Sequence, residues 1–84
     1  MTKAECEVRV RAVLAEVEPD ADLDALASDA NFVEQLGIDS LSLVDFVLEL
    51  ERETDLRVPD EDLPRLTSID AIVEYVTARQ PTAA

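Results

Sequence analysis

Apolar residues first recur at the spacing of an α-helix near the start of the chain. They are Cys6, Val10, Val13, Leu14 and Val17, which share one side of a helix. Thr2 and Glu5 have the spacing of a capping box, in which each side chain satisfies a backbone N–H at the helix start. Pro19 ends the pattern, because the residue before a proline is pushed out of helical geometry. The pattern predicts a helix over roughly residues 3–18.

Two later stretches also have helical character. Good helix formers run without interruption from Leu41 to about Glu53 and predict a helix that starts near Ser40. After Thr67 and Ser68, which we expect to cap it, a last helix should run to about Ala78. Its apolar residues fall at positions i, i+3, i+4 and i+7, and they are Ile69, Ile72, Val73 and Val76. Between these helices, residues 58–63 predict an extended turn and a short helical piece.

A long connection, residues 19–38, separates the first two helices. It is rich in aspartate, and it also contains the apolar residues Leu23, Leu26, Phe32, Val33 and Leu36. Because a structureless loop of this length is uncommon in a small domain, we expect the apolar residues to anchor it to the helices. Asn31 is placed to cap a single helical turn over residues 31–34. Gly37, the one glycine of the sequence, predicts either a special backbone geometry or a close approach.

These elements predict an all-α fold without strands. The pattern is that of a small four-helix bundle with three main helices and one short helix, and with a long loop after the first helix. The 84 residues are enough for one domain, which we expect to span 1–84 with an ordered part of about 3–79. The small and polar residues 80–84 predict a flexible tail.

Composition narrows the classes of function. Twenty acidic against seven basic residues give a net charge of −13, which disfavours nucleic acid or an anionic membrane as partner and favours basic protein surfaces. With no histidine and only Cys6, the chain has no Ser-His-Asp or Cys-His site, no Cys₂His₂ zinc site and no internal disulfide. Cys6 is interpreted as a core residue. No apolar run reaches the roughly 18 residues of a membrane span, so we expect a cytoplasmic, monomeric protein.

The predicted helix from Ser40 has two apolar stripes. At about 100° per residue, one set consists of Leu43, Phe46, Val47 and Leu50, and the other of Leu41, Val44 and Leu48 on the opposite side. Asp45, Glu49 and Glu51 flank the second set. Since one stripe suffices for the core, the second is interpreted as a docking face. The alternative is a central helix buried on all sides, against which the flanking carboxylates argue.

Ser40 lies where the backbone N–H groups and dipole of a helix N-terminus favour an attached or bound phosphate. From these residues alone, Asp39 or Ser40 could equally be an ordinary N-cap. The segment Leu36-Gly37-Ile38-Asp39-Ser40-Leu41, however, resembles the phosphopantetheine attachment motif of the acyl carrier proteins. The resemblance continues through residues 44–51, 58–62, 67–69 and 73–76.

The resemblance implies a carrier that is the substrate of an enzyme and has no catalytic residues or bound metal of its own. By it, Ser40 is the attachment point of a phosphopantetheine arm derived from coenzyme A, within a motif formed with Gly37 and Leu41. Asp39 would help to engage the magnesium-dependent phosphopantetheinyl transferase. The arm would hold acyl groups as thioesters for an acyltransferase, a ketosynthase and other acyl-processing enzymes with basic docking surfaces. Leu41, Val44 and Leu48 would be the apolar contacts, and Asp45, Glu49 and Glu51 the acidic ones.

Some residues depart from the family pattern. Gln35 and Ser42 stand where acids are common, Thr54 stands where an aromatic often ends the helix, and Arg52 and Arg57 add positive charge. The attachment site is intact, but the identity of the partner enzymes is left open. So is the choice between fatty-acid and polyketide biosynthesis. Whether an acyl chain shelters between the helices or the core is simply packed is open as well.

Parts of the sequence also suggest three other functions. Asp20, Asp22 and Asp24 have the spacing of calcium ligands, but Ala25 and Asn31 stand where such a loop needs glycine and glutamate. An unmodified scaffold bundle that binds one protein would need no arm at Ser40. An aminoacyl or peptidyl carrier is the closest alternative, and it is disfavoured because such carriers more often have a second glycine where Ile38 stands and are usually less acidic.

Overall fold

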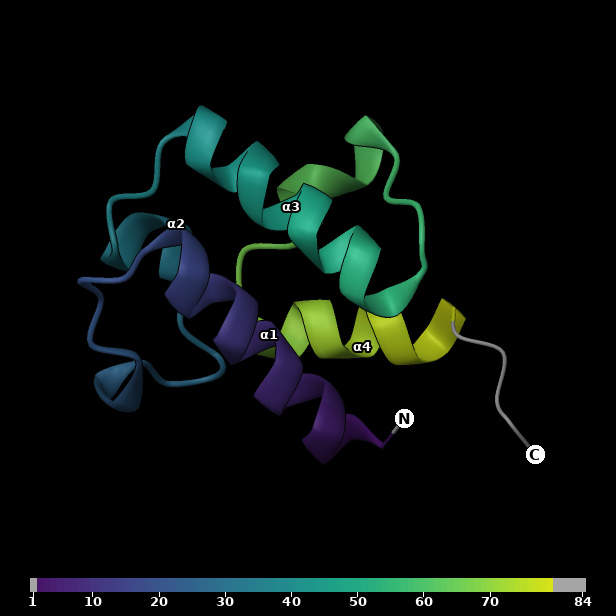
Figure 1. The fold of residues 1–84 in the computed structure, drawn as a ribbon, viewed down its shortest axis with the longest axis horizontal. Coiled ribbons are helices and arrows are strands. Elements are labelled where there is room, and N and C mark those ends of the chain that lie inside the picture. Colours follow the sequence, from purple (N-terminus) through teal and green to yellow (C-terminus); the bar gives the residue numbers. More distant parts are fainter. Residues whose placement is uncertain (1, 80–84) are drawn as a thin grey trace.

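The computed structural model describes residues 2–79 and contains helices only within them (Figure 1). The α-helices are α1 (Lys3–Val17), α2 (Phe32–Gln35), α3 (Ser40–Thr54) and α4 (Ile69–Arg79). Two 3₁₀ helices, η1 (Leu23–Ala25) and η2 (Asp60–Arg65), lie in the connections. The all-α prediction, the three main helices and the two short pieces near residues 32 and 60 are confirmed, while η1 was not predicted. The prediction of a flexible tail at 80–84 falls outside the described residues.

Local signals set the ends of the helices. The capping box at the start of α1 is present, since the Glu5 N–H donates to Thr2 Oγ1 over 3.1 Å and the Thr2 N–H donates to Glu5 Oε1 over 3.2 Å. The Asn31 side chain accepts from the Glu34 N–H at the start of α2. Ser68 Oγ accepts from the Ala71 N–H at the start of α4. Each cap satisfies a backbone donor that the first helical turn leaves unpaired, as the sequence predicted.

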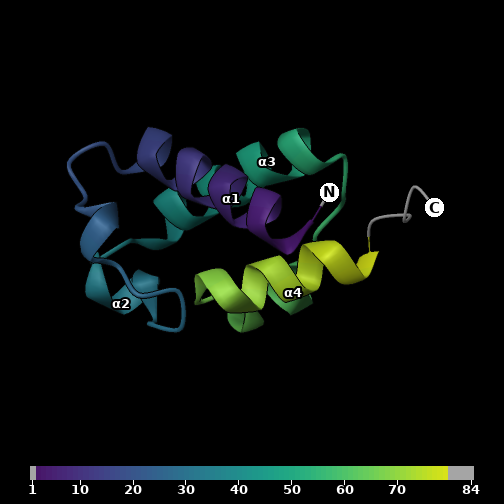
Figure 2. The same cartoon turned by 90° about the horizontal axis from the view of Figure 1, so that it is seen from below.

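One apolar core lies between the three main helices. α1 packs against both α3 and α4 (Figures 1 and 2). Phe32 of α2 and Phe46 of α3 meet edge to face at the centre, with ring centroids 5.6 Å apart. Cys6 is fully buried, in agreement with its interpretation as a core residue. Ile38, Leu66 and Tyr75 are also buried, although their sequence pattern did not indicate it.

The connection between α1 and α3 is anchored, as predicted, by more than apolar contacts. Leu26 and Phe32 are buried in the core. The guanidinium of Arg11 donates to the carbonyl oxygens of Leu23 and Leu26 over 2.8 and 3.1 Å. The Phe32 N–H donates to the Thr67 carbonyl, and the Asp70 N–H to the Ser28 carbonyl. These bonds tie the connection to α1 and to the start of α4.

Gly37 ends α2 in a left-handed conformation with φ +65°. The Ile38 N–H donates to the Val33 carbonyl over 2.9 Å and the Gly37 N–H to the Glu34 carbonyl over 3.3 Å, which is the Schellman pattern. A Cβ at Gly37 would meet no atom within 4 Å. Backbone geometry, and not a close approach, therefore accounts for the glycine, and the turn leads the chain directly to Ser40.

None of the described helices combines the length and the apolar character that crossing a membrane requires.

Candidate functional site at the start of α3

Asp39 is the N-cap of α3. Its backbone is extended, with φ −82° and ψ 173°, and Oδ1 accepts from the Ser42 N–H over 2.8 Å. The pKa of Asp39 lies below its ordinary value, mainly because the Ser42 backbone N–H donates a hydrogen bond to the carboxylate. A further bond from Ser42 and one from the Leu41 N–H lower the pKa in the same direction. The carboxylate is thus ionised at neutral pH and lies beside the positive end of the helix.

Ser40 is the first residue of α3, and its side chain is exposed. Because Asp39 supplies the cap, the Ser40 hydroxyl is not needed for it. The hydroxyl makes no hydrogen bond with any other part of the described chain. Of the two N-cap candidates that the sequence left open, the structure selects Asp39 and leaves Ser40 accessible to another protein.

The site can present a hydroxyl but has no group suited to activating it. The chain has no histidine, and the Asp39 carboxylate is occupied by the backbone of its own helix. A serine hydroxyl is a poor nucleophile unless a base or a metal assists it. Among residues 2–79, no three histidine, cysteine, aspartate or glutamate side chains come together as a metal site would need. In the aspartate-rich connection, Asp22 Oδ1 instead accepts from the Ala25 N–H and caps η1.

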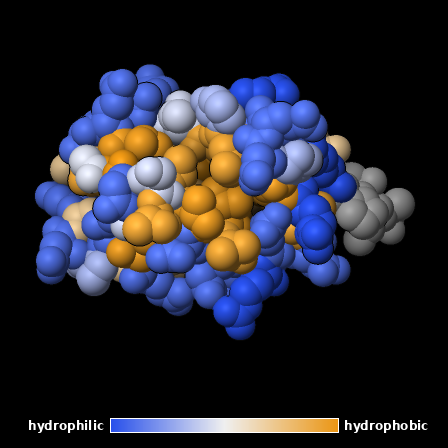
Figure 3. All heavy atoms as spheres, turned by 90° about the horizontal axis from the view of Figure 1, so that it is seen from above, coloured by the Kyte–Doolittle hydropathy of each residue, from blue (hydrophilic) through white to orange (hydrophobic). Residues whose placement is uncertain are grey.

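α3 has the two apolar faces that its sequence predicted. Phe46, Val47 and Leu50 are at most 6% exposed and belong to the core. Leu41, Val44 and Leu48 are 78%, 43% and 52% exposed. The alternative of a helix buried on all sides is therefore wrong. The face of the molecule shown in Figure 3 has an apolar centre with hydrophilic residues around it.

The three predicted acidic contacts differ in how their carboxylates are engaged. Asp45 is exposed and has no ion pair within residues 2–79. Glu49 pairs with Arg52, with Oε1 and Nη1 2.8 Å apart. Glu51 Oε2 accepts from the Val58 N–H over 2.6 Å and so holds the chain that follows α3. The structure brings all three to one surface, but only Asp45 is unengaged within this part of the chain.

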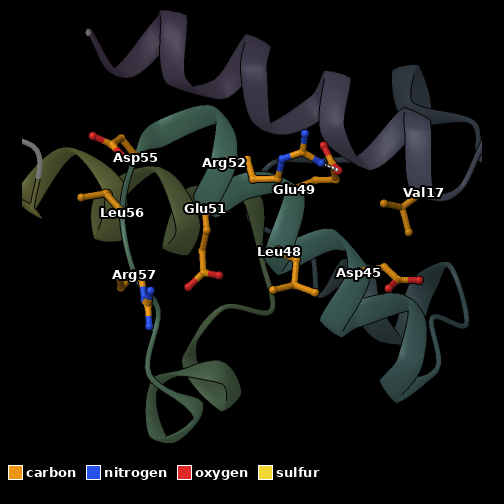
Figure 4. Close-up of a pocket in the computed structure, with 9 residues that line it drawn as sticks. All are labelled: Val17, Asp45, Leu48, Glu49, Glu51, Arg52, Asp55, Leu56 and Arg57. Carbon is orange, nitrogen blue, oxygen red and sulfur yellow. Dashed lines mark hydrogen bonds and ion pairs between the residues drawn. The ribbon is translucent and has the colours of Figure 1, made fainter.

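A groove runs beside the C-terminal half of α3, and the sequence did not predict it (Figure 4). Its volume is about 640 Å³, and we call it the α3 groove. The lining includes Val17, Asp45, Leu48, Glu51, Leu56 and Arg57. It forms because Asp55, with φ 56°, turns the chain back along α3. An aspartate directly after a helix is the only sequence signal of this turn, since aspartate tolerates the left-handed region better than most residues.

Comparison with protein-family models gives one match that extends over most of the chain. The model described as the phosphopantetheine attachment site matches residues 8–76. The chain belongs to the acyl carrier protein family. Members of this family are carriers and not catalysts, and their prosthetic group is a covalently attached phosphopantetheine. The family resemblance predicted from the sequence is confirmed.

A solved structure agrees with this acyl carrier protein fold. The solution structure of a protein from Anaplasma phagocytophilum, described there as an acyl carrier protein, superimposes with a TM-score of 0.87 at 26% sequence identity. The match covers 99% of this chain and 97% of that one. The described helices therefore share the fold of that protein.

Proposed function

We propose that this protein carries acyl intermediates as thioesters on a phosphopantetheine arm attached to Ser40. It delivers them to the enzymes of fatty-acid or polyketide biosynthesis. The observation that carries the proposal is the exposed Ser40 hydroxyl at the N-terminus of α3. This hydroxyl has no capping role, because Asp39 caps the helix. A phosphate ester at this position suits the helix dipole and the backbone N–H groups of the first turn.

The residues around Ser40 support a role as substrate of a phosphopantetheinyl transferase. The transferase supplies the base or metal that the chain itself does not offer, and coenzyme A is the source of the arm. The ionised Asp39 carboxylate lies next to the hydroxyl and engages the magnesium-dependent enzyme. Gly37 sets the turn that presents Ser40, and Leu41 is a 78% exposed apolar contact directly after it.

The exposed face of α3 supports brief docking of several enzymes in turn. Leu41, Val44 and Leu48 offer a small apolar surface, and the carboxylates of Asp45, Glu49 and Glu51 lie beside it. With a net charge of −13, electrostatic steering raises association rates toward basic surfaces, and salt weakens it. The partners are the transferase, an acyltransferase and a ketosynthase, and the carrier acts as a monomer.

The attachment is tested by incubation with coenzyme A, magnesium and a phosphopantetheinyl transferase, followed by intact mass spectrometry. The wild-type protein gains the mass of one arm. Ser40→Ala gains none, while the matched control Ser42→Ala, two residues along the same helix, is modified like the wild type. An unmodified wild type, or a modified Ser40→Ala variant, would refute the proposal and favour an unmodified scaffold.

The cargo distinguishes this function from that of an aminoacyl or peptidyl carrier. Mass spectrometry of the protein purified from its own cells identifies the group on the arm. We expect a fatty or polyketide acyl group, whereas an amino acid or peptide would favour the alternative.

A further inference from the structure

Arg57 differs from the other lysines and arginines in having no ion pair or aromatic partner within residues 2–79. The sequence has seven lysines and arginines. Five of them form ion pairs, which are Lys3–Glu74, Arg9–Glu53, Arg11–Glu7, Arg52–Glu49 and Arg65–Asp62. Arg79 lies over the ring of Tyr75, 3.6 Å from its centroid. Within residues 2–79, Arg57 alone has neither an ion pair nor an aromatic partner, although the chain has 20 acidic residues.

The backbone that carries Arg57 is fixed on both sides by a single residue of α3. The Leu56 N–H donates to the main-chain oxygen of Glu51 over 3.2 Å. The Val58 N–H donates to the side chain of the same residue, Oε2, over 2.6 Å. The guanidinium of Arg57 is therefore exposed, while hydrogen bonds fix the backbone on both sides of it. Such a group loses less conformational entropy on binding than one on a free loop.

The α3 groove places this cation beside an apolar surface and away from the free carboxylate of Asp45. Figure 4 shows Arg52 directed at Glu49, whereas Arg57 extends from the connection after α3 and has no such partner. Leu48, which is 52% exposed, and Leu56 lie in the same groove. The groove thus combines apolar side chains with one arginine and two carboxylates, those of Asp45 and Asp55, that have no ion pair within residues 2–79.

A uniformly basic partner does not match this distribution of charge. It would attract Asp45 but repel Arg57, and like charges placed opposite each other in an interface are costly. A partner that fits has a basic group for Asp45, an apolar side chain for Leu48 and a carboxylate for Arg57. A carboxylate suits arginine in particular, because a guanidinium binds it through two parallel hydrogen bonds.

We propose that acyl-processing enzymes bind the α3 groove through a surface of mixed charge, on which one carboxylate pairs with Arg57. The pair selects between enzymes, since those without the carboxylate bind the carrier less well. The inference rests on the proposed function, because it takes the occupant of the groove to be an enzyme that acts on the Ser40-linked arm.

The test uses the ketosynthase purified from the same source and the arm-loaded, acylated forms of four proteins. These are the wild type, Arg57→Gln, Arg57→Glu and the control Lys3→Glu. The control changes the net charge as much as Arg57→Glu does, but at an exposed residue of α1 that lies outside the groove. We expect Arg57→Glu to lower kcat/KM about tenfold and Arg57→Gln to lower it less, mainly through KM. Lys3→Glu should stay at or slightly above the wild-type value.

The opposite result has a definite meaning. If the docking surface is uniformly basic, Arg57→Glu reacts as fast as the wild type or faster at low ionic strength, and the inference is overturned. If Arg57→Glu is slow, each acidic residue around the arm entrance of the ketosynthase is reversed to lysine in turn. One of these changes should restore most of the lost kcat/KM, and restoration by none of them also overturns the inference.

Intact mass separates this inference from the proposed function. All four proteins should gain one arm when an excess of transferase is used. If the wild-type protein gains no arm, the proposed function itself is refuted. If every protein gains the arm and Arg57→Glu keeps the wild-type kcat/KM, only the proposed role of Arg57 is refuted.

Discussion

Replacing Gly37 by alanine isolates the conformational cost of the turn that leads to Ser40. With φ +65°, Gly37 lies where the Cβ of an L-residue crowds its own backbone. A Cβ built there meets nothing within 4 Å, so no neighbour adds a clash. The left-handed geometry costs on the order of 1–2 kcal/mol, and the lower entropy of alanine in the unfolded chain offsets roughly half of this. The net loss in the free energy of unfolding should be about 1 kcal/mol.

Urea denaturation followed by far-UV circular dichroism measures this loss. With an m value of about 1 kcal/mol/M, the midpoint should fall by about 1 M without a change in slope. Gly37→Asn is the matched control, because asparagine has a Cβ but adopts the left-handed region more readily. It should cost less than alanine.

Two outcomes would refute this reasoning. A loss above about 3 kcal/mol would mean that the added Cβ meets crowded surroundings. Equal losses for alanine and asparagine would show that the presence of a Cβ, and not the backbone angle, is what matters.

Two further predictions concern the ends of α3. Asp55→Gly should stabilise the protein by at most about 0.5 kcal/mol, seen as a slightly higher urea midpoint, because glycine adopts φ 56° without strain but has more entropy in the unfolded chain. Asp55→Ala removes the same charge but keeps the strain, so an equal gain there would assign the effect to charge. Asp39→Asn keeps the cap but cannot titrate. Because the folded pKa of Asp39 is lowered, its contribution is complete above the ordinary value of 3.8 and is lost as pH falls through the folded value. The difference in thermal stability between wild type and Asp39→Asn should therefore shrink in acid, and a pH-independent difference would contradict this.

Local features of the fold could be predicted from the sequence. The periodicity of α1 and α4, the capping box of Thr2 and Glu5, and the cap at Asn31 all depend on residues within a few positions of each other. The two faces of α3 were also predictable, since the angle of 100° per residue fixes which side chains share a side. The attachment motif around Ser40 is a contiguous string of residues, so its resemblance to a known family needed no structure.

Tertiary structure decided what depends on residues far apart in the chain. The sequence allowed Asp39 or Ser40 as the N-cap and left the reason for Gly37 open. The folded structure shows that Asp39 is the cap and that Gly37 is needed for its left-handed backbone. Tyr75 was not expected in the core, yet its hydroxyl donates to Asp62 Oδ2 over 2.7 Å. The α3 groove and the isolation of Arg57 arise because the chain folds back at Asp55 and brings distant side chains to one surface. Periodicity determines which face of a helix is apolar, but packing between helices determines which groups remain free to bind a partner.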